Sequence, residues 1–144
     1  METNIYIFFG MTDRHLKTSA KMAVVMGLFL PVAETVRRIN QILDYREFFS
    51  WFDDYILGAI LLWAAYSVFK NKKNNVAYLI AAWGIATGAL FLSFLGQFRY
   101  YQTASGDPGI FSTTFVAVAK ALILVYILIG LTKAIKSNLH HTNI

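Results

Sequence analysis

The chain is organised around residues 31–54, which read PVAETVRRINQILDYREFFSWFDD. This segment is rich in charged side chains, whereas the sequence on either side of it is strongly apolar. On a helix, Glu34, Arg37, Arg38 and Gln41 follow the spacing i, i+3, i+4, i+7 and therefore share one face. A polar face inside an apolar chain needs water or polar partners, so we expect it to point into a cavity or toward paired charges.

The composition is typical of a membrane protein. Hydrophobic residues make up 57% of the 144 residues and charged residues only 15%, whereas soluble domains usually carry about a quarter charged residues. Several runs approach the roughly 20 apolar residues that cross about 30 Å of hydrocarbon. We therefore predict one all-α domain over residues 1–144, an integral membrane four-helix bundle that passes several times through the inner (cytoplasmic) membrane and has the lipid bilayer as its surroundings.

Four spanning helices are expected, at about residues 17–44, 48–69, 76–98 and 110–131. Pro31 should kink the first of them, because a proline removes one helical hydrogen bond. Residues 1–21 are expected to lie on the membrane surface as an interfacial anchor, with a disordered start as the alternative. The tail from Lys133 onward is expected to be a frayed polar end.

The third predicted helix carries small residues on two faces. One face holds Ala77, Ala81, Gly84 and Gly88, and the other holds Ala82, Ala86, Ala89, Ser93 and Gln97. Small residues allow close approach of neighbouring helices in a membrane, so we expect this helix at the centre of the bundle. The Gly84-x-x-x-Gly88 pattern fits internal contact and dimerisation equally well, which leaves a homo-oligomer or a membrane partner protein open.

The basic residues predict the orientation. Eight lie on one side of the predicted membrane and four on the other: Arg14, Lys17, Lys21, Lys70, Lys72, Lys73, Lys133 and Lys136 against Arg37, Arg38, Arg46 and Arg99. The side richer in Lys and Arg usually faces the cytoplasm, so we expect both termini there. The same excess explains the sequence pI near 9.5, and we expect no nucleic-acid partner.

Lys120 is the clearest single candidate for a functional or paired charge, because it lies near the middle of an apolar helix, too deep for its ammonium group to reach the membrane interface easily. Glu34 is expected at a similar depth, so a Glu34–Lys120 contact is available, with Asp53 or Asp54 as the next candidates. Such a pair could hold the helices in register, belong to an ion or ligand site, or be absent if the lysine snorkels or is uncharged.

The candidate binding or charge-network residues are Glu34, Arg37, Arg38, Gln41, Asp53, Asp54 and Lys120. Their charges could neutralise one another in an outward-facing cavity, and arginine forks suit carboxylates of the protein or of a ligand. Adjacent acids point about 100° apart on a helix. Asp53 and Asp54 are therefore expected to cap their helix rather than to hold a cation together.

The sequence offers no catalytic or cofactor motif. It has no cysteine, and its three histidines lie near the chain ends, which argues against disulfides, haem and zinc sites. No nucleophile elbow, phosphate loop or protease signature is present. We expect no cofactor, no metal and no catalytic residue, and a membrane enzyme ranks third among the functional classes.

Several segments resemble a set of small, uncharacterised bacterial four-helix membrane proteins. They are Pro31-x-x-Glu34-Thr-x-Arg37-Arg38, Trp51-x-Asp53-Asp54-Tyr55, Ala82-Trp-Gly84, Ser93-Phe-x-Gly96-Gln97 and Asp107-Pro-Gly. The resemblance covers most of the chain after residue 20 and implies the four-helix membrane fold, but no activity. The layout is also similar to DoxX-type proteins, without matching motifs.

Two functional classes follow. In the first, the charged cluster binds or conducts an ion, a proton or a small polar solute. In the second, the protein is a structural or accessory membrane subunit whose charges only hold the bundle together.

Overall fold

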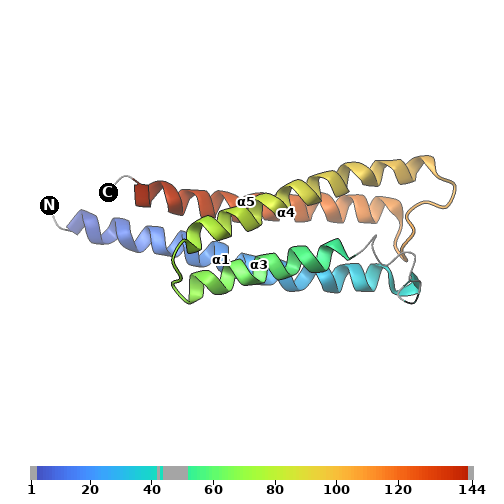
Figure 1. Cartoon of the computed structure of the whole chain (residues 1–144). Helices are drawn as coiled ribbons and strands as arrows, with labels where there is room; N and C mark the ends of the chain where they lie inside the picture. Colours follow the sequence, from blue (N-terminus) through green and yellow to red (C-terminus); the bar gives the residue numbers. More distant parts are fainter. Residues whose placement is uncertain (1–2, 42, 44–51, 143–144) are drawn as a thin grey trace.

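The computed structural model describes residues 3–41, 43 and 52–142. Its α-helices are α1 (Thr3–Arg37), α3 (Asp53–Phe69), α4 (Asn75–Gln97) and α5 (Thr113–Thr142), and two short 3-10 helices, η1 (Ile39–Gln41) and η2 (Phe98–Gln102), follow α1 and α4. Figure 1 shows the four α-helices running along one common axis. The prediction of an all-α four-helix bundle is confirmed.

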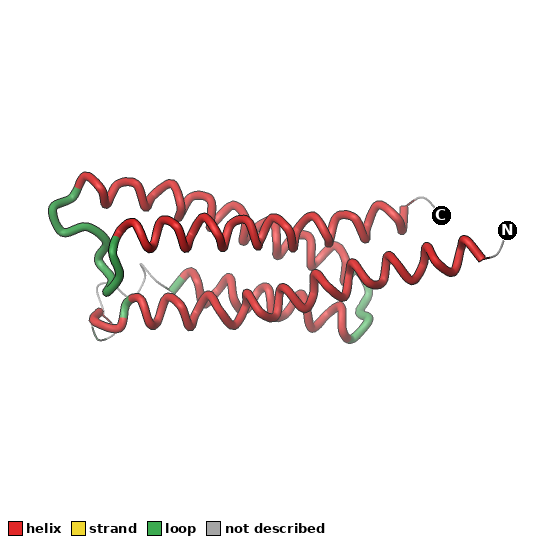
Figure 2. Tube along the Cα trace, turned by 180° about the vertical axis from the view of Figure 1, so that it is seen from behind, coloured by secondary structure: helices red, strands yellow, loops and turns green. Residues whose placement is uncertain are grey.

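The helices are arranged as a ring, in which α1 contacts α3, α3 contacts α4, α4 contacts α5 and α5 contacts α1. Seen from the front and from behind, α1 and α3 form one layer and α4 and α5 the other (Figures 1 and 2). The loop of residues 103–112, between η2 and α5, lies at the end of the bundle where α1 finishes and α3 begins. We call this the loop end. The start of α1 and the finish of α5 lie at the opposite end.

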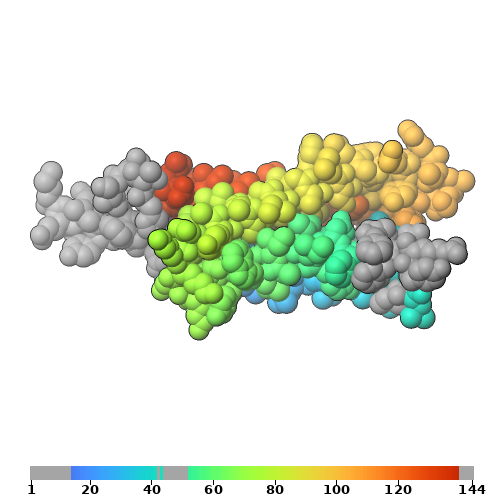
Figure 3. All heavy atoms as spheres, in the orientation of Figure 1, coloured from blue at the N-terminus to red at the C-terminus, as the bar shows by residue number. Residues whose placement is uncertain are grey.

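The outer surface of the bundle is apolar. Figure 3 shows an elongated molecule with α3 and α4 on the visible face. Large apolar side chains such as Leu92 and Leu122 are 69% and 67% exposed, while Glu34 and Arg38 are each only 7% exposed. Charged side chains in the interior and apolar side chains on the surface are the reverse of the arrangement in a soluble protein and are typical of a membrane bundle.

Three of the helices have the length and apolarity to cross a membrane, as judged over the described residues. The segments are Arg14–Arg37, Asn75–Gln102 and Thr113–Leu139. The remaining helix, α3, has 17 residues, which corresponds to roughly 25 Å, slightly less than the hydrocarbon thickness. It is part of the bundle through its contacts with α1 and α4.

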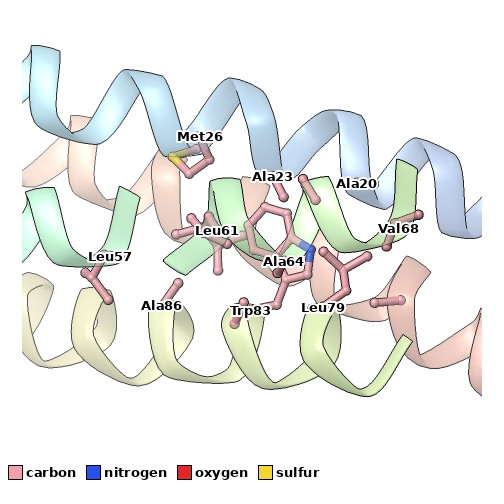
Figure 4. Close-up of a cluster of buried hydrophobic side chains, with 14 of the residues drawn as sticks. Ala20, Ala23, Met26, Leu57, Leu61, Ala64, Val68, Leu79, Trp83 and Ala86 are labelled. Carbon is pink, nitrogen blue, oxygen red and sulfur yellow. The ribbon is translucent and has the colours of Figure 1, made fainter. Parts of the chain in front are cut away.

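The core is built around Trp83, whose indole ring is fully buried between small and aliphatic residues (Figure 4). Its ring lies directly against Gly130 on α5, where a Cβ would come within 2.5 Å of the ring atom Cζ2. Its Nε1–H donates to Ser19 Oγ at 2.9 Å, and Ser19 Oγ donates to the Gly130 carbonyl oxygen at 2.8 Å. One tryptophan therefore joins α1, α4 and α5.

Helices α1 and α3 touch through glycine. A Cβ on Gly58 would lie 2.5 Å from the Gly27 carbonyl oxygen, and one on Gly27 would lie 2.9 Å from the Gly58 carbonyl oxygen. Pro31 has no N–H to donate to Gly27, and the helix nevertheless continues past it to Arg37. The carbonyl oxygen that loses its helical donor lies against Gly58, so the proline and the two glycines form one backbone contact.

The small faces of α4 do not place it at the centre, so that prediction is wrong. Ala82 and Ala86 are buried against the core, but Gly84 and Gly88 are exposed, and a Cβ on either would meet no described residue within 4 Å. Within one chain, the Gly84-x-x-x-Gly88 pattern makes no helix contact. Whether it serves a homo-oligomer stays a prediction.

The helix bounds differ from the expected ones at three places. The first helix begins at Thr3 rather than near residue 17, because residues 3–16 contain no proline to interrupt it. It ends at Arg37 rather than near residue 44. The loop of residues 103–112 covers the Arg37 carbonyl oxygen at that point. The last helix runs on to Thr142 rather than stopping near 131, so the expected frayed tail is helical. The predicted turn at 44–47 and helix start at 48–51 lie outside the described residues.

Candidate functional site

The loop of residues 103–112 folds back over the finish of α1 and closes the loop end. The Ile110 N–H donates to the Arg37 carbonyl oxygen at 3.0 Å, and Gln41 Nε2 donates to the Pro108 carbonyl oxygen at 3.0 Å. Gly109 lies so close to α1 that a Cβ would come within 2.7 Å of the Arg37 carbonyl oxygen. The loop thus satisfies the last carbonyl group of α1, which a helix terminus leaves open.

Glu34 is held by two arginines of its own helix. Its Oε1 and Oε2 accept hydrogen bonds from Arg37 Nη1 at 3.1 and 2.9 Å, and Oε1 also accepts from Arg38 Nε at 3.0 Å. Arg38 Nη1 in turn donates to Gln41 Oε1 at 2.9 Å. The i, i+3, i+4, i+7 spacing seen in the sequence is therefore a hydrogen-bonded row, with its carboxylate fully engaged.

Asp107 anchors the loop to Arg37. Arg37 Nη2 donates to Oδ2 at 2.7 Å and Nε donates to Oδ1 at 3.2 Å. Gln97 Nε2 donates to Oδ2 at 2.8 Å, and the Gly109 N–H donates to Oδ1 at 2.9 Å. Burial raises the pKa of Asp107, but the hydrogen bonds from Arg37, Gln97 and Gly109 and the Arg37 charge outweigh it and hold the pKa below its usual value.

Gln97 links Asp107 to Lys120. Its amide nitrogen donates to the carboxylate, and its amide oxygen accepts from Lys120 Nζ at 3.0 Å. Lys120 Nζ also donates to the Ser93 carbonyl oxygen at 3.2 Å. A continuous hydrogen-bonded path thus runs from α1 through the loop and α4 to α5. We call its members the polar network: Glu34, Arg37, Arg38, Gln97, Asp107 and Lys120.

The expected Glu34–Lys120 contact is wrong. Both carboxylate oxygens of Glu34 are engaged by arginines, and the hydrogen bonds that Lys120 makes within the described residues go to neutral acceptors on α4. The sequence argument matched the depths of the two residues along the bundle but not their directions around it. Two network members, Gln97 and Asp107, were missed as site residues. The sequence pattern places Gln97 only on a face of small residues, and Asp107 stands in an Asp-Pro-Gly sequence that is typical of a turn.

Asp53 and Asp54 lie in the first turn of α3, where acids are favoured by the helix dipole. Neither is the N-cap, which is Phe52 with no side-chain hydrogen bond, so the expected capping role is wrong. Asp53 Oδ1 instead accepts the N–H of Asp54 at 3.0 Å.

A cavity of about 710 Å³ lies beside the polar network. Six of the seven candidate residues line it: Glu34, Arg37, Arg38, Asp53, Asp54 and Lys120. Gln41 lies outside it, against Arg38 and Pro108. Most of the remaining wall is apolar and comes from α1, α4 and α5, including Phe29, Leu90 and Phe115. The charged residues picked from the sequence therefore surround one space.

No protein-family model, curated protein or solved structure matches this chain. The resemblance to small bacterial four-helix membrane proteins stays a prediction. Within the described residues, no group of three or more His, Cys, Asp or Glu side chains is arranged to hold a metal ion.

Proposed function

We propose that this protein is a multi-pass protein of the inner membrane that binds a small polar or partly polar solute in the cavity at its loop end. The volume of about 710 Å³ falls within the range of about 300–1,000 Å³ common for small-molecule sites. It is much larger than a bare ion or a proton path needs. The mixture of apolar walls and a few converging charges is also usual for such sites.

The observation that carries the proposal is the position of Lys120 in the cavity wall and the hydrogen bonds that its ammonium group makes there. Lys120 lines the cavity, and within the described residues its Nζ donates to the Ser93 carbonyl oxygen and to the Gln97 amide oxygen. An ammonium has three N–H donors and a full charge, so one donor and the charge remain for a bound molecule. Ionisable groups inside a membrane bundle are costly to keep and mark functional sites by default, and the hydrogen bonds of this one go to neutral acceptors rather than to a carboxylate.

The second candidate is the structural or accessory subunit. It is favoured by the saturation of the other charges, because Glu34 and Asp107 each accept several hydrogen bonds from groups of the same chain. Under this alternative the polar network only fastens α1 to the loop and to α4. It leaves the size of the cavity and the position of Lys120 without a role.

A substitution that fills the cavity distinguishes the ligand-binding proposal from the structural alternative. Gly96 lines the cavity, and a Cβ there would meet nothing within 4 Å in the described part of the chain, so Gly96→Leu should fold. Gly88→Leu places the same side chain on the same helix, also in open space but outside the cavity lining. The full chain is unfolded thermally with hexanoate, hexylamine or hexanol present at equal concentration.

Binding predicts that at least one of these molecules raises the Tm of the wild type and of Gly88→Leu but not of Gly96→Leu. A ligand at 100 times its Kd stabilises by about 2.7 kcal/mol, which such a measurement detects easily. Equal shifts in all three proteins, or none in any, would support the structural alternative.

A further inference from the structure

The cavity has a polar wall and an apolar wall that reaches the outside of the bundle. Its lining includes Phe29, Val32 and Val36 of α1 and Phe115 of α5. These four side chains are also 44%, 62%, 46% and 57% exposed. Because the same residues line the cavity and face the surroundings, the cavity opens sideways between α1 and α5, two helices that contact each other.

In a membrane this opening meets hydrocarbon. Both segments bearing it, Arg14–Arg37 and Thr113–Leu139, are among the three that are long and apolar enough to span. An opening lined by phenylalanine and valine admits an alkyl chain without stripping water from polar groups. A purely polar solute would have to pass the same apolar wall.

The polar wall favours a negative head group. Glu34 is engaged by Arg37 and Arg38 and cannot serve a cation without losing those bonds. Lys120 has a donor and a charge to offer, and Arg38 has used Nε and Nη1 but shows no partner at Nη2 among the described residues. The free donors of this wall are therefore cationic.

The head group should carry a single charge. The cavity is lined by four bases, Arg37, Arg38, Arg99 and Lys120, and by three acids, Glu34, Asp53 and Asp54. Asp107, outside the lining, engages Arg37. With Asp107 counted, acids and bases balance, and the two acids of α3 face the same space. A multiply charged anion would be repelled, whereas one carboxylate or phosphodiester charge on Lys120 is accommodated.

Resting on the proposed function, we infer that the ligand is a singly charged anionic amphiphile. Its carboxylate or phosphodiester group accepts hydrogen bonds from Lys120 Nζ, and its hydrocarbon chain leaves between α1 and α5 into the membrane. Charge-assisted hydrogen bonds of this kind are the stronger class.

The test uses the full chain in phosphatidylcholine nanodiscs and thermal unfolding with four probes: dodecanoate, dodecanol, dodecyltrimethylammonium and acetate. Gly96→Leu corrects for probes that act only through the bilayer. Dodecanoate should bind the wild type about 10-fold more tightly than dodecanol, and acetate and dodecyltrimethylammonium should give no shift beyond that of Gly96→Leu. This comparison needs no change at Lys120.

Lys120→Gln should abolish the preference of dodecanoate over dodecanol, and Lys120→Arg should keep it. Lys136→Gln is the control, because Lys136 is exposed on the same helix at the other end of the bundle. If dodecyltrimethylammonium or acetate binds as well as dodecanoate, the inference is overturned and the proposed function stands. If no probe distinguishes the wild type from Gly96→Leu, the inference about the ligand and the proposed binding function are both overturned.

Discussion

Arg37 and Asp107 form a two-bond ion pair, with Nη2–Oδ2 at 2.7 Å and Nε–Oδ1 at 3.2 Å, between the last residue of α1 and the loop that precedes α5. Both residues are buried, at 9% and 8% exposure. Because the two belong to segments far apart in the chain, the pair helps to hold the loop in place, together with the bonds from Ile110 and Gln41. The loop in turn closes the end of the bundle that holds the cavity.

Breaking this pair from one side should be strongly destabilising. Asp107→Asn leaves Glu34 as the one carboxylate shared by Arg37 and Arg38, so one buried positive charge loses its partner, and losses of about 3–5 kcal/mol are usual in that case. Chemical unfolding of the purified protein measures the change. Asp53→Asn is the matched control, because Asp53 is exposed and surface substitutions usually stay within about 0.5 kcal/mol. Equal effects of the two substitutions would contradict the structural role of the pair.

The same carboxylate predicts how stability depends on pH. The pKa of Asp107 is lowered in the folded protein, so its ionised form favours folding. That contribution is complete above the unfolded-state pKa of about 4 and is lost as the pH falls through the lower, folded-state pKa. Unfolding free energies measured from pH 6 downward should therefore fall below about pH 4, and less steeply in Asp107→Asn. Identical slopes for the two proteins would show that other groups are responsible.

Glycines that contact another helix should tolerate substitution far less than those that face outward. Gly130→Ala forces a methyl group against the Trp83 ring, and overfilling a core costs about 1–3 kcal/mol. Gly88→Ala meets open space and gains helix propensity, so its stability should be unchanged or slightly higher. Thermal unfolding at low protein concentration compares them. A greater loss for Gly88→Ala would restore the central position first expected for α4.

The orientation is tested by labelling single cysteines in this cysteine-free chain. Lys72 and Ser105 are both exposed, in the turn before α4 and in the loop after it, and those two connections lie at opposite ends of the bundle. With both termini cytoplasmic, an impermeant thiol reagent applied to intact cells should label Ser105→Cys and not Lys72→Cys. The reverse pattern would invert the orientation.

The sequence predicted the parts of this structure that depend on local pattern. The apolar runs located the helices, since α4 was expected at 76–98 and runs from Asn75 to Gln97. The spacing of Glu34, Arg37 and Arg38 placed them on one face, where they do meet. These results follow from helix geometry alone.

The missed features depend on how the chain returns on itself. Asp-Pro-Gly at residues 107–109 is a typical turn sequence, but turn chemistry does not say that the loop folds over α1 and brings its carboxylate to Arg37. Lys120 was matched with Glu34 by depth. The rotation of α5 about its axis points Lys120 toward Gln97 instead. That rotation is set by contacts between helices, such as Trp83 against Gly130, which the pattern of a single helix does not contain.

Trp83 and Gln97 are both fully buried and both lie on α4, about four helical turns apart. One joins α4 to the core and the other joins it to the loop end. Inserting or deleting one residue between them would rotate one side chain by about 100° relative to the other, so that only one of the two contacts could form. The stretch between them therefore has a defined length, because even the insertion of a whole turn, which restores the direction, would displace Gln97 by about 5.4 Å along the bundle.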